Sequence, residues 1–194
     1  MKNAAPIERD LVLIGGGHSH VNVIRGLAMH PIPGVRLTVI SREANTPYSG
    51  MLPGFLAGHY SFDECHVDLQ RLCRFADARL FHTPVTGINP EARQIICANR
   101  PPVDFDLLSI DIGSTPSRFG IKGADPYAIA VKPAGDFLRH LDVLEKNVLG
   151  RDTAFHIVII GGGAGGSELC LALRHRLRTG IAIQGGNPDR LRFS

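Results

Sequence analysis

Two glycine-rich stretches contain the residues whose types and spacing most clearly indicate chemistry. The first reads LIGGGHSHV over 13–21, and the second reads IIGGGAGGSE over 159–168. Each follows an apolar run typical of a buried strand and precedes a segment that can form a helix. In a G-x-G-x-x-G turn the glycines allow a tight turn, a close approach of phosphate and close helix–strand packing. Because the helix N-terminus also attracts anions, the sequence predicts two dinucleotide-binding turns.

The second stretch fits this motif completely, since each of its three key positions carries a glycine. A glycine turn without a ligand is the alternative interpretation. The strand before the turn and the helix after it favour nucleotide binding. The three positions are Gly161, Gly163 and Gly166.

The first stretch departs from the motif at its third position. Gly15 and Gly17 fit, but His20 stands where a small residue is usual. Three interpretations stay open: a phosphate-binding turn, a metal site that uses His18 and His20, or a turn without a ligand. A metal would need a third ligand, and no motif ties one to this pair, so phosphate binding is favoured. We expect the His20 ring to widen the gap between helix and strand or to point outward, and we expect His20→Gly to be tolerated.

The position that usually holds a ribose hydroxyl differs from the motif as well. An acidic residue is expected at the end of the second strand, near residue 41. The sequence has Ser41 there, followed by Arg42 and Glu43. We predict that the Ser41 hydroxyl takes this role and that Glu43 lies within reach.

The elements around the first turn form a strand–helix–strand unit. Apolar runs at 10–16 and 35–41 flank a helical segment at 19–30, which is typical of a right-handed parallel βαβ unit. The middle of the chain predicts a loop with a helical turn at 46–61 and three or four strands over 78–116. Between them a helix is expected at 67–76, where apolar residues, Phe75 among them, recur at about the helical period. A strand at 127–132 and a helix at 133–150 follow, and then a strand at 155–162 and a helix ended by Gly180. The helix at 133–150 has one apolar face, made by Phe137, Leu138, Leu141, Leu144 and Val148. This order predicts an α/β, Rossmann-like fold with two dinucleotide-binding domains, 1–123 and 124–194.

The last residues do not continue this order. A second βαβ unit needs a further strand after Gly180, and IAIQ over 181–184 is the candidate for its start. The chain has only fourteen more residues after Gly180, so we expect the second domain to be incomplete and the chain to be a fragment.

Composition excludes several classes of protein. The 194 residues are 44% hydrophobic with a net charge of +3, which suits a globular core and not a nucleic-acid-binding surface. No apolar stretch is long enough for a transmembrane helix, and no signal peptide precedes the first strand. The four cysteines are irregularly spaced and include no C-x-x-C pair. Such unpaired cysteines are typical of a reducing cytoplasm. The sequence therefore shows no motif for a redox-active dithiol.

Two further motifs carry a resemblance to a known family. PYSGMLPGFLAGHYS follows the first βαβ unit, and LLSIDIGSTP ends the first domain. With two glycine turns 146 residues apart, the chain resembles the pyridine nucleotide–disulfide oxidoreductase superfamily of flavoproteins. Within it, the chain looks like the type II NADH dehydrogenase-like group, most of all the oxidoreductase domain found alone or fused ahead of selenide, water dikinase. The resemblance spans about residues 9–178.

This resemblance implies a set of cofactors and site residues. FAD would bind at the first turn and NAD(P)H at the second, with hydride passing to flavin N5 and electrons then passing to an acceptor such as a quinone. Glu168 would lie near the reacting rings, although a place in the first helical turn is the simpler alternative for this residue. The implied cofactor-binding residues are Gly15, Gly17, His18, Ser41, Arg42, Ser49, Gly50, Met51, Asp111, Gly113, Gly161, Gly163 and Gly166.

The resemblance also bears on partners. It implies a small-molecule electron acceptor and allows a homodimer, with peripheral membrane contact in a full-length form. It does not imply a disulfide reductase, because the cysteine pair is absent. The competing hypothesis is a truncated nucleotide-binding fragment that does not catalyse a reaction.

Overall fold

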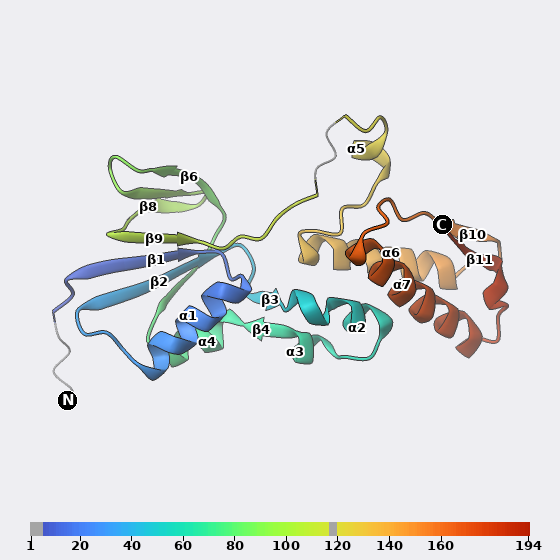
Figure 1. The fold of residues 1–194 in the computed structure, drawn as a ribbon, viewed down its shortest axis with the longest axis horizontal. Helices are drawn as coiled ribbons and strands as arrows, with labels where there is room; N and C mark the ends of the chain where they lie inside the picture. The colour runs from blue at the N-terminus through green and yellow to red at the C-terminus, as the bar shows by residue number, and fades with distance from the viewer. Residues whose placement is uncertain (1–5, 117–119) are drawn as a thin grey trace. The chain divides into compact units, whose positions relative to one another are not determined.

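The computed structural model describes residues 6–116 and 120–194, which form two compact units (Figure 1). The first unit contains the residues up to 46 together with 66–114. The second contains 47–65 and the residues from 115 onward. The functional domains 1–123 and 124–194 remain a prediction of where each nucleotide binds.

The first unit is built on a four-stranded parallel sheet with the strand order β5-β2-β1-β9. Leu13 pairs with Val39 on one side and with Ser109 on the other, so β1 lies in the middle of the sheet. The predicted βαβ unit is therefore confirmed, and its two strands are neighbours. The strands are β1 (Arg9–Ile14), β2 (Val35–Ser41), β5 (Arg79–His82) and β9 (Leu107–Ile110).

Two helices cover one face of this sheet, and a three-stranded antiparallel sheet covers the other (Figure 1). Side chains alternate along β1, so Leu13 packs against Ile24 and Cys73 of the helices. Val12 and Ile14 face the antiparallel sheet instead. Burial on both faces explains why β1 reads as a continuous apolar run. The covering elements are α1 (His18–Met29), α4 (Leu69–Phe75), β6 (Val85–Asn89), β7 (Gln94–Cys97) and β8 (Arg100–Asp104).

The segment 78–116 contains more strands than the sequence predicted. It forms five strands rather than three or four. The turn expected at residues 99–101 lies at 98–99, and Arg100 already begins β8. Phe75, assigned to the buried face of its helix, is 65% exposed.

Short elements connect the first βαβ unit to the rest of the chain. The Y-S-G-M-L-P-G segment forms a 3-10 turn and a helix with Leu56 buried. These elements are β3 (Asn45–Pro47), η1 (Ser49–Met51), α2 (Leu52–Ala57), α3 (Phe62–Cys65) and β4 (His66–Asp68), with β3 paired to β4.

The second unit is built on two long helices and a small parallel sheet. Phe137, Leu141 and Val148 are buried on one face of α6, as the sequence predicts, and Leu173 and Leu177 of α7 lie in the same core clusters. The elements are α5 (Ala124–Tyr127), α6 (Ala134–Leu149), β10 (Phe155–Ile157), α7 (Ala164–Ile183), η2 (Pro188–Arg190) and β11 (Leu191–Phe193).

Three expectations about this unit are wrong. The helix does not end at Gly180 but continues to Ile183, because the missing side chain lets Leu149 of α6 pack against the helix. A Cβ on Gly180 would lie 3.1 Å from Leu149 Cδ2. The first three residues of IAIQ therefore belong to α7 and Gln184 caps the helix. The strand that follows is β11, parallel to β10. The segment 127–132 forms no strand, since α5 ends at Tyr127 and residues 128–132 have no regular structure.

Candidate functional site

The first glycine turn is held between β2 and the residue that follows β9. The Gly15 N–H donates to the Ile40 carbonyl at 2.8 Å, and the Asp111 N–H donates to the Ile14 carbonyl at 2.8 Å. Gly15 has a φ of +92°, and a Cβ there would overlap the Asp111 carbonyl. This position therefore requires glycine both for its backbone conformation and for its packing.

Asp111 caps the helix that follows this turn. Its carboxylate Oδ2 accepts from the Ser19 N–H at 3.0 Å and from the His20 N–H at 3.3 Å. The N-cap residue of α1 is Gly17, which has no side chain to make these bonds. A Cβ on Gly17 would overlap the Asp111 carboxylate. In the motif the second glycine lets a phosphate approach the backbone. In this chain Gly17 also lets the Asp111 carboxylate approach it.

His20 fills the space that the third glycine usually leaves empty. Its ring is 2% exposed, Nδ1 lies 2.8 Å from the Gly15 carbonyl oxygen, and Nε2 lies 2.9 Å from Ser109 Oγ. A carbonyl only accepts, so Nδ1 donates, and in the neutral ring the Ser109 hydroxyl donates to Nε2. Of the two alternatives expected for this ring, the outward-pointing one is therefore wrong, and the ring lies buried between α1 and the sheet.

The two histidines do not share a face. His18 is exposed and contacts Asn22, whereas the His20 ring is buried with both nitrogens in hydrogen bonds. On an extended segment two residues two positions apart would face one way, but this segment is helical. Within residues 6–116 and 120–194, no group of three or more His, Cys, Asp or Glu side chains is placed to hold a metal.

Ser41 lies at the end of β2, where the motif places the ribose-binding residue. Its hydroxyl donates to the Glu43 carbonyl at 2.7 Å and accepts from the Glu43 N–H at 3.2 Å. Arg42 forms an ion pair with Glu43 at 3.3 Å. The Ser41 side chain is 6% exposed and holds a local turn, so its role toward a ribose stays a prediction.

The second glycine turn joins β10 to α7 and differs from the first in being open. Gly161 has a φ of +118°, and a Cβ on Gly161 or on Gly163 would meet no atom within 4 Å. A Cβ on Gly166 would overlap the Gly161 carbonyl, which is the close helix–strand contact that the motif requires. In the described part of the chain, no side chain caps α7, and its first turn holds no acidic residue.

Glu168 is the fifth residue of α7 and is exposed. The simpler alternative, an acidic residue within the first helical turn, is therefore wrong. Its proposed place near the reacting rings stays a prediction.

The remaining implied residues divide between the two units. Gly113 follows β9 in the first unit and has a φ of +71°. Ser49, Gly50 and Met51 form η1 in the second unit. Their roles beside FAD therefore stay predictions.

Burial makes the cysteines poor candidates for redox chemistry. None of the four forms a disulfide with another described residue, and three are buried. Burial raises the pKa of the Cys73 thiol to about 11 and raises the pKa values of Cys65 and Cys97 as well. A thiol must ionise to react, so these three are largely unreactive at neutral pH.

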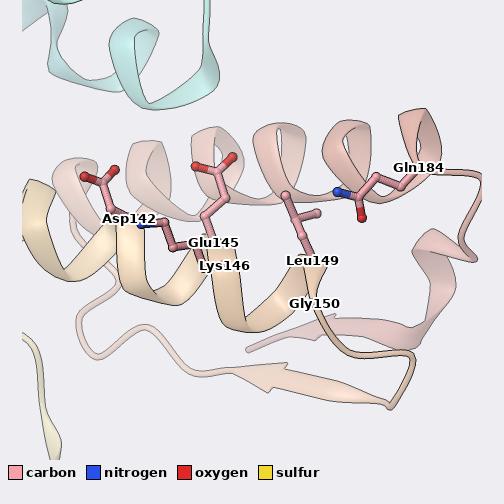
Figure 2. A pocket seen from close by; sticks show the side chains of 6 residues that line it. All are labelled: Asp142, Glu145, Lys146, Leu149, Gly150 and Gln184. Atoms are coloured by element: carbon pink, nitrogen blue, oxygen red, sulfur yellow. The ribbon is translucent and has the colours of Figure 1, made fainter.

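A groove of about 520 Å³ lies beside the C-terminal half of α6 (Figure 2). The glycine turn precedes α7, whereas Gln184 of the groove follows it. A helix of 20 residues spans about 30 Å, so the groove and the turn lie at opposite ends of α7. The groove is therefore not part of the candidate site. Its lining residues are Asp142, Glu145, Lys146, Leu149, Gly150 and Gln184.

The sequence did not predict how two side chains hold the first turn. They are Ser109 of β9 and Asp111, which follows this strand. Asp111 is in the implied set, but its role as a helix cap was not foreseen, and Ser109 was not named. The contacts join residues about 90 positions apart. The available signal was that parallel strands end at one edge of a sheet, which brings the residue after β9 to the turn after β1.

Comparison with known proteins agrees with this architecture. Residues 9–183 match the family described as pyridine nucleotide-disulphide oxidoreductase. The chain is 26% identical over 178 residues to the NADH dehydrogenase-like protein YutJ of Bacillus subtilis, covering 86% of this chain and 45% of that protein. It is 24% identical over 188 residues to a probable NADH dehydrogenase of Dictyostelium discoideum, covering 86% of this chain and 40% of that protein. The chain thus spans less than half the length of these relatives.

Solved structures show the same fold. NDH2 from Plasmodium falciparum in complex with NADH superposes with a TM-score of 0.76 at 20% identity, over 95% of this chain and 41% of that one. A water-forming NADH oxidase from Lactobacillus brevis bound to NADH gives 0.67 at 18% identity, over 96% and 46%. Among the described residues, no helix is long and apolar enough to cross a membrane. On the match that covers nearly all of its residues, the chain belongs to the pyridine nucleotide-disulphide oxidoreductase family.

Proposed function

We propose that this chain binds FAD at the first glycine turn and NAD(P)H at the second, as part of an NAD(P)H–flavin oxidoreductase. The observation that carries the proposal is the presence of two strand–glycine–helix turns in one chain of this family. One relative is named an NADH dehydrogenase-like protein and another a probable NADH dehydrogenase, and two proteins of similar structure were solved with NADH bound.

The second turn supports NAD(P)H binding through its openness. A Cβ on any of Gly161, Gly162 and Gly163 would meet no atom within 4 Å, and among the described residues no side chain caps the 20-residue helix α7. A helix N-terminus of this kind favours a phosphate. The close approach of Gly166 to the Gly161 carbonyl holds the helix against the turn.

The first turn supports an anionic ligand in a different way. The α1 N-terminus already holds a carboxylate, that of Asp111, on two backbone N–H groups. The position therefore fits a negatively charged group such as a phosphate of FAD. Gly15 and Gly17 would lie against this ligand, with His18 at its exposed edge.

The proposed chemistry divides between the cofactor and the chain. Bound flavin supplies the capacity to accept two electrons from NAD(P)H. The turns hold and orient the phosphates, and Glu168 would present its carboxylate beside the nicotinamide. A quinone is the proposed acceptor, and a homodimer is proposed as well, both from the family resemblance. A cytoplasmic location is proposed from the irregular spacing of the cysteines.

The experiment combines FAD and NADH titrations of the purified chain with a variant of the second turn. Gly162→Asp places a carboxylate where a Cβ meets nothing within 4 Å, so the fold should tolerate it. We expect this variant to weaken NADH binding by about tenfold or more through charge repulsion, while FAD binding is unchanged. Gly162→Asn, of the same shape without the charge, is the matched control. A wild-type chain that binds neither nucleotide would overturn the proposal.

Nucleotide binding without turnover is the second candidate, because the chain spans only 45% and 40% of its relatives. It predicts NADH binding without NADH oxidation when FAD and a dye or quinone acceptor are supplied. Oxidation that Gly162→Asp abolishes would favour the oxidoreductase.

A further inference from the structure

The two glycine turns differ in the charge that lies on their helices. At the first turn, the Asp111 carboxylate accepts from two backbone N–H groups of α1. At the second, the first turn of α7 carries no acidic residue and no capping side chain among the described residues. Only the first turn therefore holds an anion of its own where a phosphate is expected.

Most backbone donors of the first turn are already used. The Gly15 N–H donates to Ile40, the Gly17 N–H to the Asp111 carbonyl, and the N–H groups of Ser19 and His20 to the Asp111 carboxylate. A phosphate that used either of the last two donors would compete with the carboxylate. Two negative groups at one helix end also repel each other.

Asp111 can give up this position through its side chain alone. Its backbone is held on both sides, because its N–H donates to Ile14 and its carbonyl accepts from Gly17. Among the described residues, the Asp111 carboxylate accepts hydrogen bonds from the N–H groups of Ser19 and His20, and rotation about its χ angles would release both. The strand and the turn can therefore stay in place while the carboxylate moves.

We propose that Asp111 is an internal anion that competes with the FAD phosphates for the N-terminus of α1. This inference rests on the proposed function, and it concerns the affinity of the same site. The carboxylate keeps the helix end capped when FAD is absent, and it must leave Ser19 and His20 when FAD binds. The affinity of this site for FAD is therefore lower than it would be without the Asp111 carboxylate on the helix N-terminus.

The test compares Asp111→Asn with wild type in an FAD titration followed by quenching of flavin fluorescence. The amide keeps an oxygen that can accept from the helix but removes the charge. We expect FAD to bind about tenfold more tightly to this variant. Riboflavin, which lacks phosphates, should show no such gain.

Asp106→Asn is the matched control, because it makes the same change at the other end of β9. Asp106 also accepts a backbone N–H, that of Asp10, at 2.7 Å. Asp106 and Asp111 flank the four residues of β9, and five steps of about 3.3 Å place them about 16 Å apart, so this variant should bind FAD like wild type. Thermal unfolding of all three proteins checks that each is folded. If Asp111→Asn is unfolded, Asp111→Ser, with a hydroxyl acceptor, replaces it.

A second readout follows the carboxylate directly. In wild type, FAD should shift the backbone amide NMR resonances of Ser19 and His20, because both lose the Asp111 oxygen. Equal or weaker FAD binding by the uncharged variant, or unshifted resonances at saturation, would overturn the inference and leave the proposed function intact. Absence of FAD binding in every variant would overturn both.

Discussion

The two glycine turns of this chain follow one sequence motif but are completed by different atoms. At the second turn, Gly166 approaches the Gly161 carbonyl directly, and the turn is open. At the first, a histidine ring and a carboxylate fill the corresponding space. The comparison teaches that the motif specifies a strand–turn–helix geometry, whereas the side chains from β9 decide what lies on the helix end.

The largest expected effect tests how tightly the first turn is packed. Gly15→Ala should lower the free energy of unfolding by about 4 kcal/mol or more, because its Cβ would overlap a backbone carbonyl. Gly161→Ala should cost about 1–3 kcal/mol, since only its φ is unfavourable. Urea unfolding of both variants measures the difference. Equal losses would show that the two turns are packed alike.

The next effect concerns the histidine at the third motif position. His20→Gly should destabilise the chain by about 3 kcal/mol, because it leaves a cavity and removes the partner of the Gly15 carbonyl. The expectation from sequence that this change is tolerated is therefore replaced. His18→Gly, at an exposed position, is the control and should cost about 1 kcal/mol or less. A tolerated His20→Gly would mean that the helix closes onto the strand as at Gly166.

A third experiment separates Gly17 from its partner. Gly17→Ala should cost about 2 kcal/mol, because the new methyl group meets the Asp111 carboxylate. In an Asp111→Ala background this cost should fall by about 1 kcal/mol, the coupling expected of residues in contact. Gly163→Ala, the same change at the open turn, should cost less than about 1 kcal/mol. Additive losses at Gly17 and Asp111 would contradict the contact.

The parts of the molecule predicted correctly from sequence are those set by local pattern. Continuous apolar runs identified β1 and β2, and helical periodicity identified the buried face of α6 through Phe137 and Leu141. The family and the fold class followed from the two glycine turns and their spacing. Local pattern suffices here because each element is buried along its length or on one regular face.

The incorrect parts depend on contacts between distant residues. Gly180 looks like a helix end, but packing by Leu149 extends the helix past it. The orientation of His20 depends on Ser109, which lies 89 positions away. The sequence marks His20 as unusual for its motif position, but it does not identify Ser109 as its partner, because that contact depends on β9 lying beside β1.

The smallest expected effect concerns the support beneath the first turn. Leu69 of α4 lies against Gly16, and Cys73 of the same helix is buried beside Leu13. Burial raises the pKa of Cys73 to about 11 in the folded chain, so the unfolded chain loses this proton at a lower pH. The stability present below pH 9 should therefore decline as pH rises toward 11, by at most about 1.4 kcal/mol per pH unit.

Urea unfolding at several pH values measures this slope in wild type and in Cys73→Ala. The variant should be less stable at every pH because of the lost volume, but its stability should fall less steeply above pH 9. An unchanged slope would show that Cys73 ionises at the same pH in the folded and the unfolded chain. A reduced slope would show that Cys73 ionises in the unfolded chain at a pH at which burial beside Leu13 keeps it protonated in the folded chain. The buried residues of the α6–α7 clusters include no thiol, so the second unit has no counterpart to this effect in those clusters.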